Sequence, residues 1–145
     1  MKILSGLALA ALLAAPAVHA APQTLEITRA WSRPAVAGTN GAGYLTVLNR
    51  GAVADAVVAV ECPVAGRVDM HSMSMTGGVM SMQKVDRVAV PARGQAEFGP
   101  GGYHLMLMGL TRTLKVGDQV PATVTFASGA RLTTAFVVAV APPAS

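Results

Sequence analysis

Residues 101–110 read Gly-Gly-Tyr-His-Leu-Met-Leu-Met-Gly-Leu, and this stretch decides the kind of fold that the sequence predicts. Within it, His104, Met106 and Met108 occupy alternate positions, with a leucine between each of them. Successive side chains of a β-strand point to opposite faces. The alternation therefore predicts a strand with leucine on one face and a histidine with two methionines on the other. The glycine and proline residues just before it, at 99–102, predict a turn.

The same short strand pattern recurs along the chain and predicts an all-β fold. We expect strands at residues 25–28, 44–48, 54–60, 67–73, 79–82, 85–90, 103–108, 120–126 and 132–140. Residues typical of turns separate them, as at 49–51, 76–78 and 116–118. Short strands at this spacing are typical of an antiparallel Greek-key β-sandwich or barrel. No stretch shows helical periodicity with capping residues.

The N-terminus has the features of a secretory signal peptide, which we predict to span residues 1–20. Lys2 supplies a positive charge, an apolar stretch covers 3–13, and small residues end at Ala20, where we expect cleavage. A membrane anchor is the alternative, but this apolar stretch is short for a hydrocarbon core about 30 Å thick. The exported chain would be residues 21–145, a single domain of 125 residues.

The charge distribution argues against a nucleic-acid partner. The formal net charge is +4 at pH 7, the basic residues are scattered, and aromatic residues make up 4% of the chain. Nucleic-acid-binding domains instead gather basic residues on one face. Beyond residue 20 no apolar run has membrane length. We therefore expect a soluble monomer without stable membrane insertion.

Cys62 is the single cysteine, so no disulfide can form within one chain. We interpret it as a small buried apolar side chain. A further soft metal ligand or a redox-active thiol is the alternative. A blue-copper electron carrier needs a cysteine thiolate with two histidines, normally close together near the C-terminus. Cys62 instead precedes both histidines of the exported chain.

Histidine and methionine gather in three short segments of the exported chain. His71 and His104 are its two histidines, and all seven of its methionines lie at 70–75, 80–82 and 106–108. Thioether sulfur is soft and uncharged, so it favours Cu(I) over zinc, magnesium or calcium. Thioethers also suit an oxidising compartment better than thiols do. The alternative is a structural or adhesive β-sandwich in which methionines fill the core.

The spacing of four of these residues resembles a known motif. Ten residues separate His71 from Met82, twenty-one separate Met82 from His104, and one separates His104 from Met106. This H-x10-M-x21-H-x-M pattern resembles that of the PCuAC family of periplasmic copper chaperones. The flanking segments 30–34 (AWSRP) and 43–47 (GYLTV) are also similar to that family.

The resemblance implies a cupredoxin-like β-sandwich that binds one Cu(I) through the four motif residues. It further implies a periplasmic carrier, not an enzyme, that donates copper by ligand exchange. The expected acceptor is the CuA domain of cytochrome c oxidase subunit II, reached directly or through a Sco-type protein. A periplasmic copper-buffering or resistance protein without a dedicated acceptor is the alternative. Four methionines outside the motif, Met73, Met75, Met80 and Met108, would form either a landing patch or a hydrophobic rim, of which we favour the rim.

Overall fold

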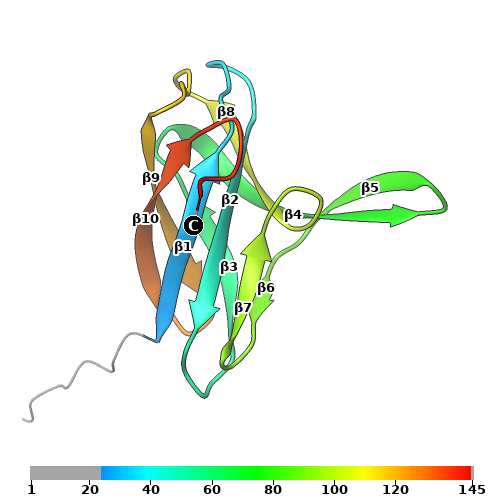
Figure 1. The fold of residues 1–145 in the computed structure, drawn as a ribbon, viewed down its shortest axis with the longest axis vertical. Coiled ribbons are helices and arrows are strands. Elements are labelled where there is room, and N and C mark those ends of the chain that lie inside the picture. Colours follow the sequence, from blue (N-terminus) through cyan, green and yellow to red (C-terminus); the bar gives the residue numbers. More distant parts are fainter. Residues whose placement is uncertain (1–23, 145) are drawn as a thin grey trace, which may run out of the picture.

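The computed structural model describes residues 24–144, which form ten β-strands (Figure 1). The strands are β1 (Leu25–Ser32), β2 (Gly41–Asn49), β3 (Asp55–Glu61), β4 (Ala65–Thr76), β5 (Val79–Lys84), β6 (Val88–Val90), β7 (Gly94–Phe98), β8 (His104–Leu110), β9 (Gln119–Phe126) and β10 (Arg131–Val138). Within the described residues, no helix has the length and apolar character needed to cross a membrane. The predicted signal peptide at 1–20 lies outside the described residues.

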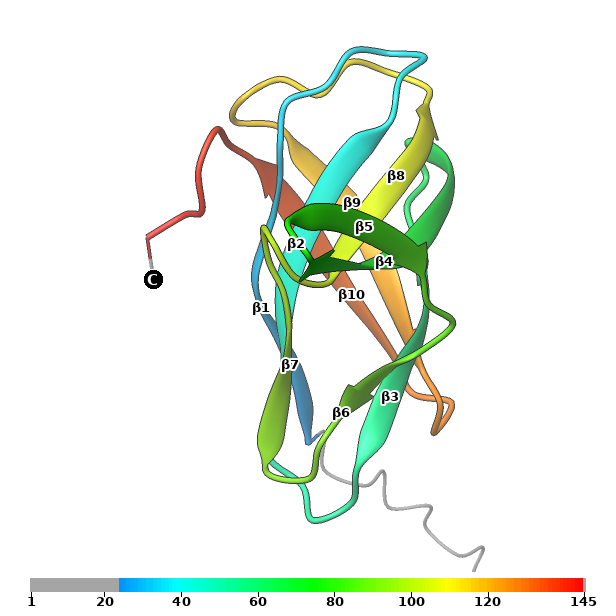
Figure 2. The ribbon, with the colours of Figure 1, turned by 90° about the vertical axis from the view of Figure 1, so that its right-hand side faces the viewer.

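The strands form one sheet in the order β5-β4-β8-β2-β1-β10-β9-β3-β6, with β7 also paired to β2. The sheet wraps around a single core, so that β3 packs against β4 and β6 packs against β7 (Figures 1 and 2). All paired strands are antiparallel except β1 and β10, which run parallel. The all-β prediction is confirmed, whereas the expectation of a purely antiparallel sheet is wrong at this one pair.

Alternate positions of several strands, such as β8 and β9, fill the core, as the sequence pattern predicts. In β8, Leu105 and Leu107 are fully buried, whereas Met106 and Met108 on the other face are half-buried. Full burial of a leucine or phenylalanine side chain contributes about 1.5–3 kcal/mol, so the aromatic and aliphatic interior accounts for the stability of the sandwich. Among the described methionines, Met70 alone is buried in this core. Core packing therefore does not explain the other six methionines.

Two differences from the predicted strands lie near each other in the chain. Of the expected strand at 85–90, only Val88–Val90 forms β6. The backbone N–H of Val85 instead donates to the carbonyl of Met70. Strand β7 was not predicted, because the glycine and proline residues before it favour a loop. Its alternation of exposed Gln95 and Glu97 with buried Ala96 and Phe98 is nevertheless that of a strand with one buried face.

A β-hairpin of β4 and β5 projects from the body of the molecule (Figures 1 and 2). The first half of β4 pairs with β8, and its second half, from His71 to Thr76, pairs with β5. Gly77 and Gly78 form the turn, with φ angles of 60° and 77°. Positive φ at both central residues is the requirement of a type I′ hairpin turn, which glycine meets without steric strain. The predicted turn at 76–78 is therefore confirmed.

Candidate metal centre

The two histidines face each other across the junction of β4 and β8. His71 and His104 are directly paired in the antiparallel register, so their side chains lie on the same face of the sheet. Their ring centroids are 5.5 Å apart. His104 is buried, and His71 is half-buried beside it. Residues 33 positions apart in the sequence thus form one imidazole pair.

Methionine side chains adjoin this imidazole pair. Met82 lies opposite Met73 across the β4–β5 hairpin. Both line a cavity of about 220 Å³ together with His104 and Met106, and its wall also includes Tyr44 from β2. Three of the four predicted ligands therefore line one cavity. The fourth, the half-buried histidine of β4, contributes no surface to that cavity and lies beside the ring of its partner on β8.

The hydrogen bonding of the two imidazoles leaves ring nitrogens unpaired. His104 Nδ1 lies 3.4 Å from the carbonyl oxygen of Gly102, to which Nδ1–H can donate. In that tautomer Nε2 keeps its lone pair. His71 Nδ1 is buried and, within residues 24–144, has no hydrogen-bond partner. An unpaired buried polar group costs about 1–3 kcal/mol, so a metal ion or another partner at this nitrogen would remove a penalty. The donor set therefore fits a metal ion.

The surroundings of His71 favour its neutral form. Burial lowers the pKa of its imidazole, and the neighbouring His104 and Lys84 lower it further, against the opposing effect of Asp69. A neutral imidazole has a lone pair for a metal, whereas a protonated one does not. At neutral pH the His71 side chain is therefore in the form that can bind a metal ion.

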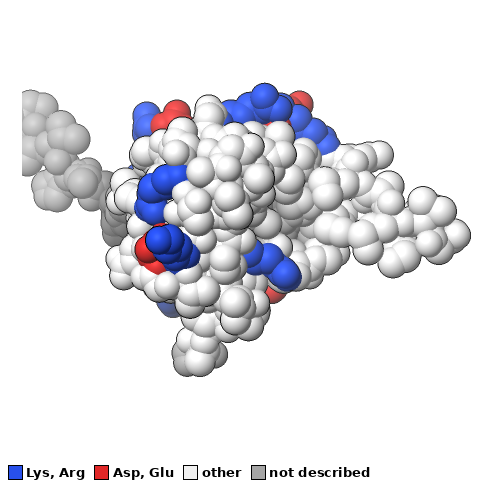
Figure 3. Space-filling model, turned by 90° about the horizontal axis from the view of Figure 1, so that it is seen from above, with Lys and Arg blue, Asp and Glu red and all other residues white. Residues whose placement is uncertain are grey.

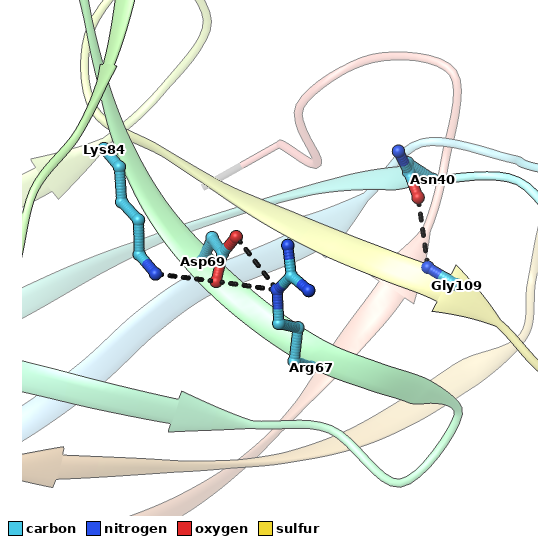
Figure 4. A network of polar contacts seen from close by, with 5 residues as sticks. All are labelled: Asn40, Arg67, Asp69, Lys84 and Gly109. Atoms are coloured by element: carbon cyan, nitrogen blue, oxygen red, sulfur yellow. Dashed lines mark hydrogen bonds and ion pairs between the residues drawn. The ribbon is translucent and has the colours of Figure 1, made fainter.

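Asp69 anchors the base of the hairpin through two ion pairs (Figure 4). The side chain of Asp69 is 9% exposed, and its carboxylate lies 3.2 Å from Arg67 Nε and 3.5 Å from Lys84 Nζ. Burial raises the pKa of Asp69, but the hydrogen bond and positive charge of Arg67, with Lys84, outweigh burial and lower it overall. Since Lys84 lies on β5 and Asp69 on β4, this network links the two strands beside the imidazoles.

Two residues have roles that the sequence motif does not show. Met73 lines the cavity although it lies outside the motif. In the sequence, its position two residues after His71 already indicated that the two side chains share one face of a strand. Cys62 is buried and lines a different cavity, whose wall includes neither histidine. Burial raises the pKa of the Cys62 thiol. The prediction of a small buried side chain is confirmed, and the arrangement is unlike a blue-copper site.

Comparison with known proteins places the chain in a family. A family model described as "Putative lipoprotein LpqE-like" matches residues 25–138. The chain belongs to the LpqE-like family. A relative from Leifsonia xyli subsp. xyli, named "Putative lipoprotein Lxx21020", is 29% identical over 106 residues. The match covers 72% of this chain and 63% of the relative, so the chain spans less than two thirds of that protein's length.

Solved structures with the same fold carry PCuAC and copper in their names. The copper-bound PCuAC domain from PmoF2 is 22% identical, with a TM-score of 0.67, over 79% of this chain and 92% of that domain. The Cu(I) form of DR1885 from Deinococcus radiodurans is 31% identical, with a TM-score of 0.60, over 81% of this LpqE-like chain and 80% of DR1885. These similarities confirm the predicted PCuAC family and its cupredoxin-like β-sandwich.

Proposed function

We propose that this LpqE-like protein carries one Cu(I) ion in the periplasm, held by His71, Met82, His104 and Met106. One observation supports the proposal best: the two histidines are directly paired across β4 and β8, beside a cavity lined by the side chains of Met82 and Met106. The relative DR1885, which is 31% identical, has a solved Cu(I) form. The name of the Leifsonia xyli relative as a lipoprotein supports export.

The chemistry of these four side chains suits a monovalent soft ion. Two thioether sulfurs and two neutral imidazole nitrogens contribute no negative charge, so a bound Cu(I) keeps its single positive charge. A divalent ion would leave twice that charge in a half-buried position. Asp69, the one carboxylate on β4, is already paired with Arg67 and Lys84. Soft donors favour Cu(I) among the metals that a protein of this kind would meet.

Release follows from the unequal exposure of the proposed ligands. Met82 is 51% exposed, whereas His104 is buried and Met106 is half-buried. An acceptor can therefore reach the copper ion from the side of Met82 first. Thiolates of the acceptor would displace this thioether and then the others, one at a time, because a thiolate binds Cu(I) more strongly. The copper ion changes ligands and keeps its oxidation state, so the protein acts as a carrier and not as an enzyme.

The proposed acceptor is the CuA domain of cytochrome c oxidase subunit II, reached directly or through a Sco-type protein. The alternative is a periplasmic protein that buffers copper without a dedicated acceptor. Mixing the Cu(I)-loaded protein with a soluble CuA domain, and separately with a Sco-type protein, distinguishes the two. Movement of copper to either acceptor supports the carrier. Tight binding without movement to either one favours buffering.

Ligand assignment is tested by competition with a chromophoric Cu(I) chelator. We expect His71→Ala and Met106→Leu each to lower the Cu(I) affinity by at least about tenfold, since even changes just outside a metal's ligands cost 10- to 100-fold. Met108→Leu is the matched control, because Met108 shares the strand and face of Met106 but does not line the cavity. Unchanged affinity in both ligand variants would refute the proposed site.

A further inference from the structure

The projecting hairpin presents a second set of thioethers beyond the proposed copper site. In the β4–β5 register, Met73 lies opposite Met82, and Met75 lies opposite Met80. Side chains two residues apart in a strand share a face, and directly opposed side chains share it too. The four methionines therefore form two adjacent cross-strand pairs on the same face of the hairpin as His71.

The outer pair is exposed to an unusual degree for apolar side chains. Met75 is 65% exposed and Met80 is 59% exposed, next to the turn of the hairpin. Residues 72–83, the outer part of the projecting hairpin, include no charged residue, and Figure 3 shows no basic or acidic group on the outer part of the hairpin, whereas such groups are scattered over the body. Packing does not account for these two methionines, since they contact no part of the buried core.

We propose that Met75 and Met80, together with Met73, form a second Cu(I) site at the tip of the hairpin, built from thioether sulfur alone. Directly opposed residues in an antiparallel pair have Cβ atoms about 4.5–5.5 Å apart, which lets two flexible methionine side chains meet on one ion. Met73 lies one alternate position further along β4, about 7 Å away, and a methionine side chain spans much of that distance. Three soft, neutral donors select Cu(I) over harder divalent ions.

This tip site adjoins the proposed carrier site through Met73. Met73 lines the cavity beside His104 and Met106, so its sulfur can serve either position. Copper would move inward when its bonds to the outer thioethers break and bonds to Met82 and the imidazoles form. Thioethers carry no proton, so the exchange needs neither proton transfer nor a change in oxidation state. The tip would therefore be the point at which Cu(I) enters or leaves the protein.

The tip site should bind copper more weakly than the carrier site. It has no imidazole ligand, and a second monovalent ion about 7 Å from the first is repelled by it. Coulomb's law converts that repulsion into a loss of about 3-fold in a water-like medium and about 50-fold at an effective dielectric constant of 20. Two separate binding steps are therefore expected.

Anaerobic titration with Cu(I), followed by NMR of ¹³C-labelled methionine methyl groups, tests this inference on the exported chain. The first equivalent should shift the signals of Met82 and Met106, and the second those of Met75 and Met80. The double variant Met75→Leu/Met80→Leu should retain the first step and lose the second. Leucine keeps the surface apolar, so this variant removes sulfur without removing hydrophobic contact. Met108→Leu is the matched single-methionine control and should retain both steps.

The possible outcomes separate this inference from the proposed function. A titration that ends after one equivalent, with Met75 and Met80 unshifted, overturns the tip site and leaves the carrier site standing. A second step that survives in the double leucine variant also overturns it. A first step that bypasses Met82 and Met106 contradicts the carrier site instead. If the leucine variant binds and transfers copper as the unmodified chain does, the tip is an apolar docking surface and not a metal site.

Discussion

Replacing Asp69 with asparagine removes the charge that links β4 to β5 and should destabilise the fold by about 1–2 kcal/mol at pH 7. The side chain of Asp69 is 9% exposed, and its carboxylate interacts with two cations, at 3.2 Å and 3.5 Å. Breaking a fully buried ion pair costs about 3–5 kcal/mol, because the abandoned partner stays buried. Here the side chains of Arg67 and Lys84 are 66% and 61% exposed, so water resolvates them and the cost is smaller.

The stability that Asp69 contributes should depend on pH, and the direction of that dependence follows from the pKa of its carboxyl group. The pKa of Asp69 is lower in the folded protein than its ordinary value, because the charges and hydrogen bond of Arg67, with Lys84, outweigh the effect of burial. A carboxylate of this kind contributes stability above its unfolded pKa, about 3.9, and loses the contribution as the pH falls through the folded pKa. The difference in unfolding free energy between the unmodified chain and Asp69→Asn should therefore be full at pH 7 and shrink below about pH 4.

Urea unfolding at pH 7 and at pH 3 measures this difference. Glu26→Gln is a matched control, because Glu26 forms an ion pair with Arg50 in which both side chains are at least half-exposed. That pair should contribute no more than about 1 kcal/mol. A loss above about 3 kcal/mol in Asp69→Asn would mean that the two cations stay desolvated in the variant. A difference that persists undiminished at pH 3 would show that the charge of Asp69 is not the cause. Either result refutes the reasoning.

Three further predictions concern the copper site, the hairpin turn and the free thiol. The Cu(I) affinity should fall only at a pH below the ordinary imidazole pKa of about 6.5, because burial above all lowers the pKa of His71 and protons compete for its nitrogen only there. Chelator competition from pH 5 to 8 measures this, and an affinity that rises toward low pH would contradict it. Gly77→Ala should lower the local stability of the hairpin by about 1–2 kcal/mol, because Gly77 has a φ of 60°. Backbone amides of the hairpin should then exchange hydrogen with solvent about 5- to 30-fold faster. Gly66→Ala is the control and should leave these exchange rates unchanged, because a methyl group at Gly66 makes only ordinary contacts. Cys62→Ala should leave the Cu(I) affinity unchanged, and a tenfold loss of affinity would instead identify Cys62 as a ligand. In the unmodified chain the Cys62 thiol should react slowly with a thiol reagent, since burial raises its pKa.

Much of the fold was predictable because alternation is a local property of the chain. Leu105 and Leu107 point into the core and Met106 points away, as the spacing of residues in β8 requires. The turn at Gly77 and Gly78 was also predictable, because glycine is the residue that accepts positive φ at both positions. The parallel pairing of β1 with β10 was not, since it depends on contacts between distant segments. Strand β7 was missed although its alternation is local, because the glycine and proline residues beside it favour a loop.

The sequence by itself determined the donor chemistry and the face of each strand that carries it. The softness of sulfur follows from residue type, and the side on which each donor lies follows from the two-residue period of a strand. Only the tertiary structure decided which donors meet. It pairs His71 with His104, adds Met73 to the cavity wall, and leaves Met75 and Met80 exposed on a projecting hairpin. These relations depend on which strands pair and in which register, and burial of the whole apolar core decides that pairing.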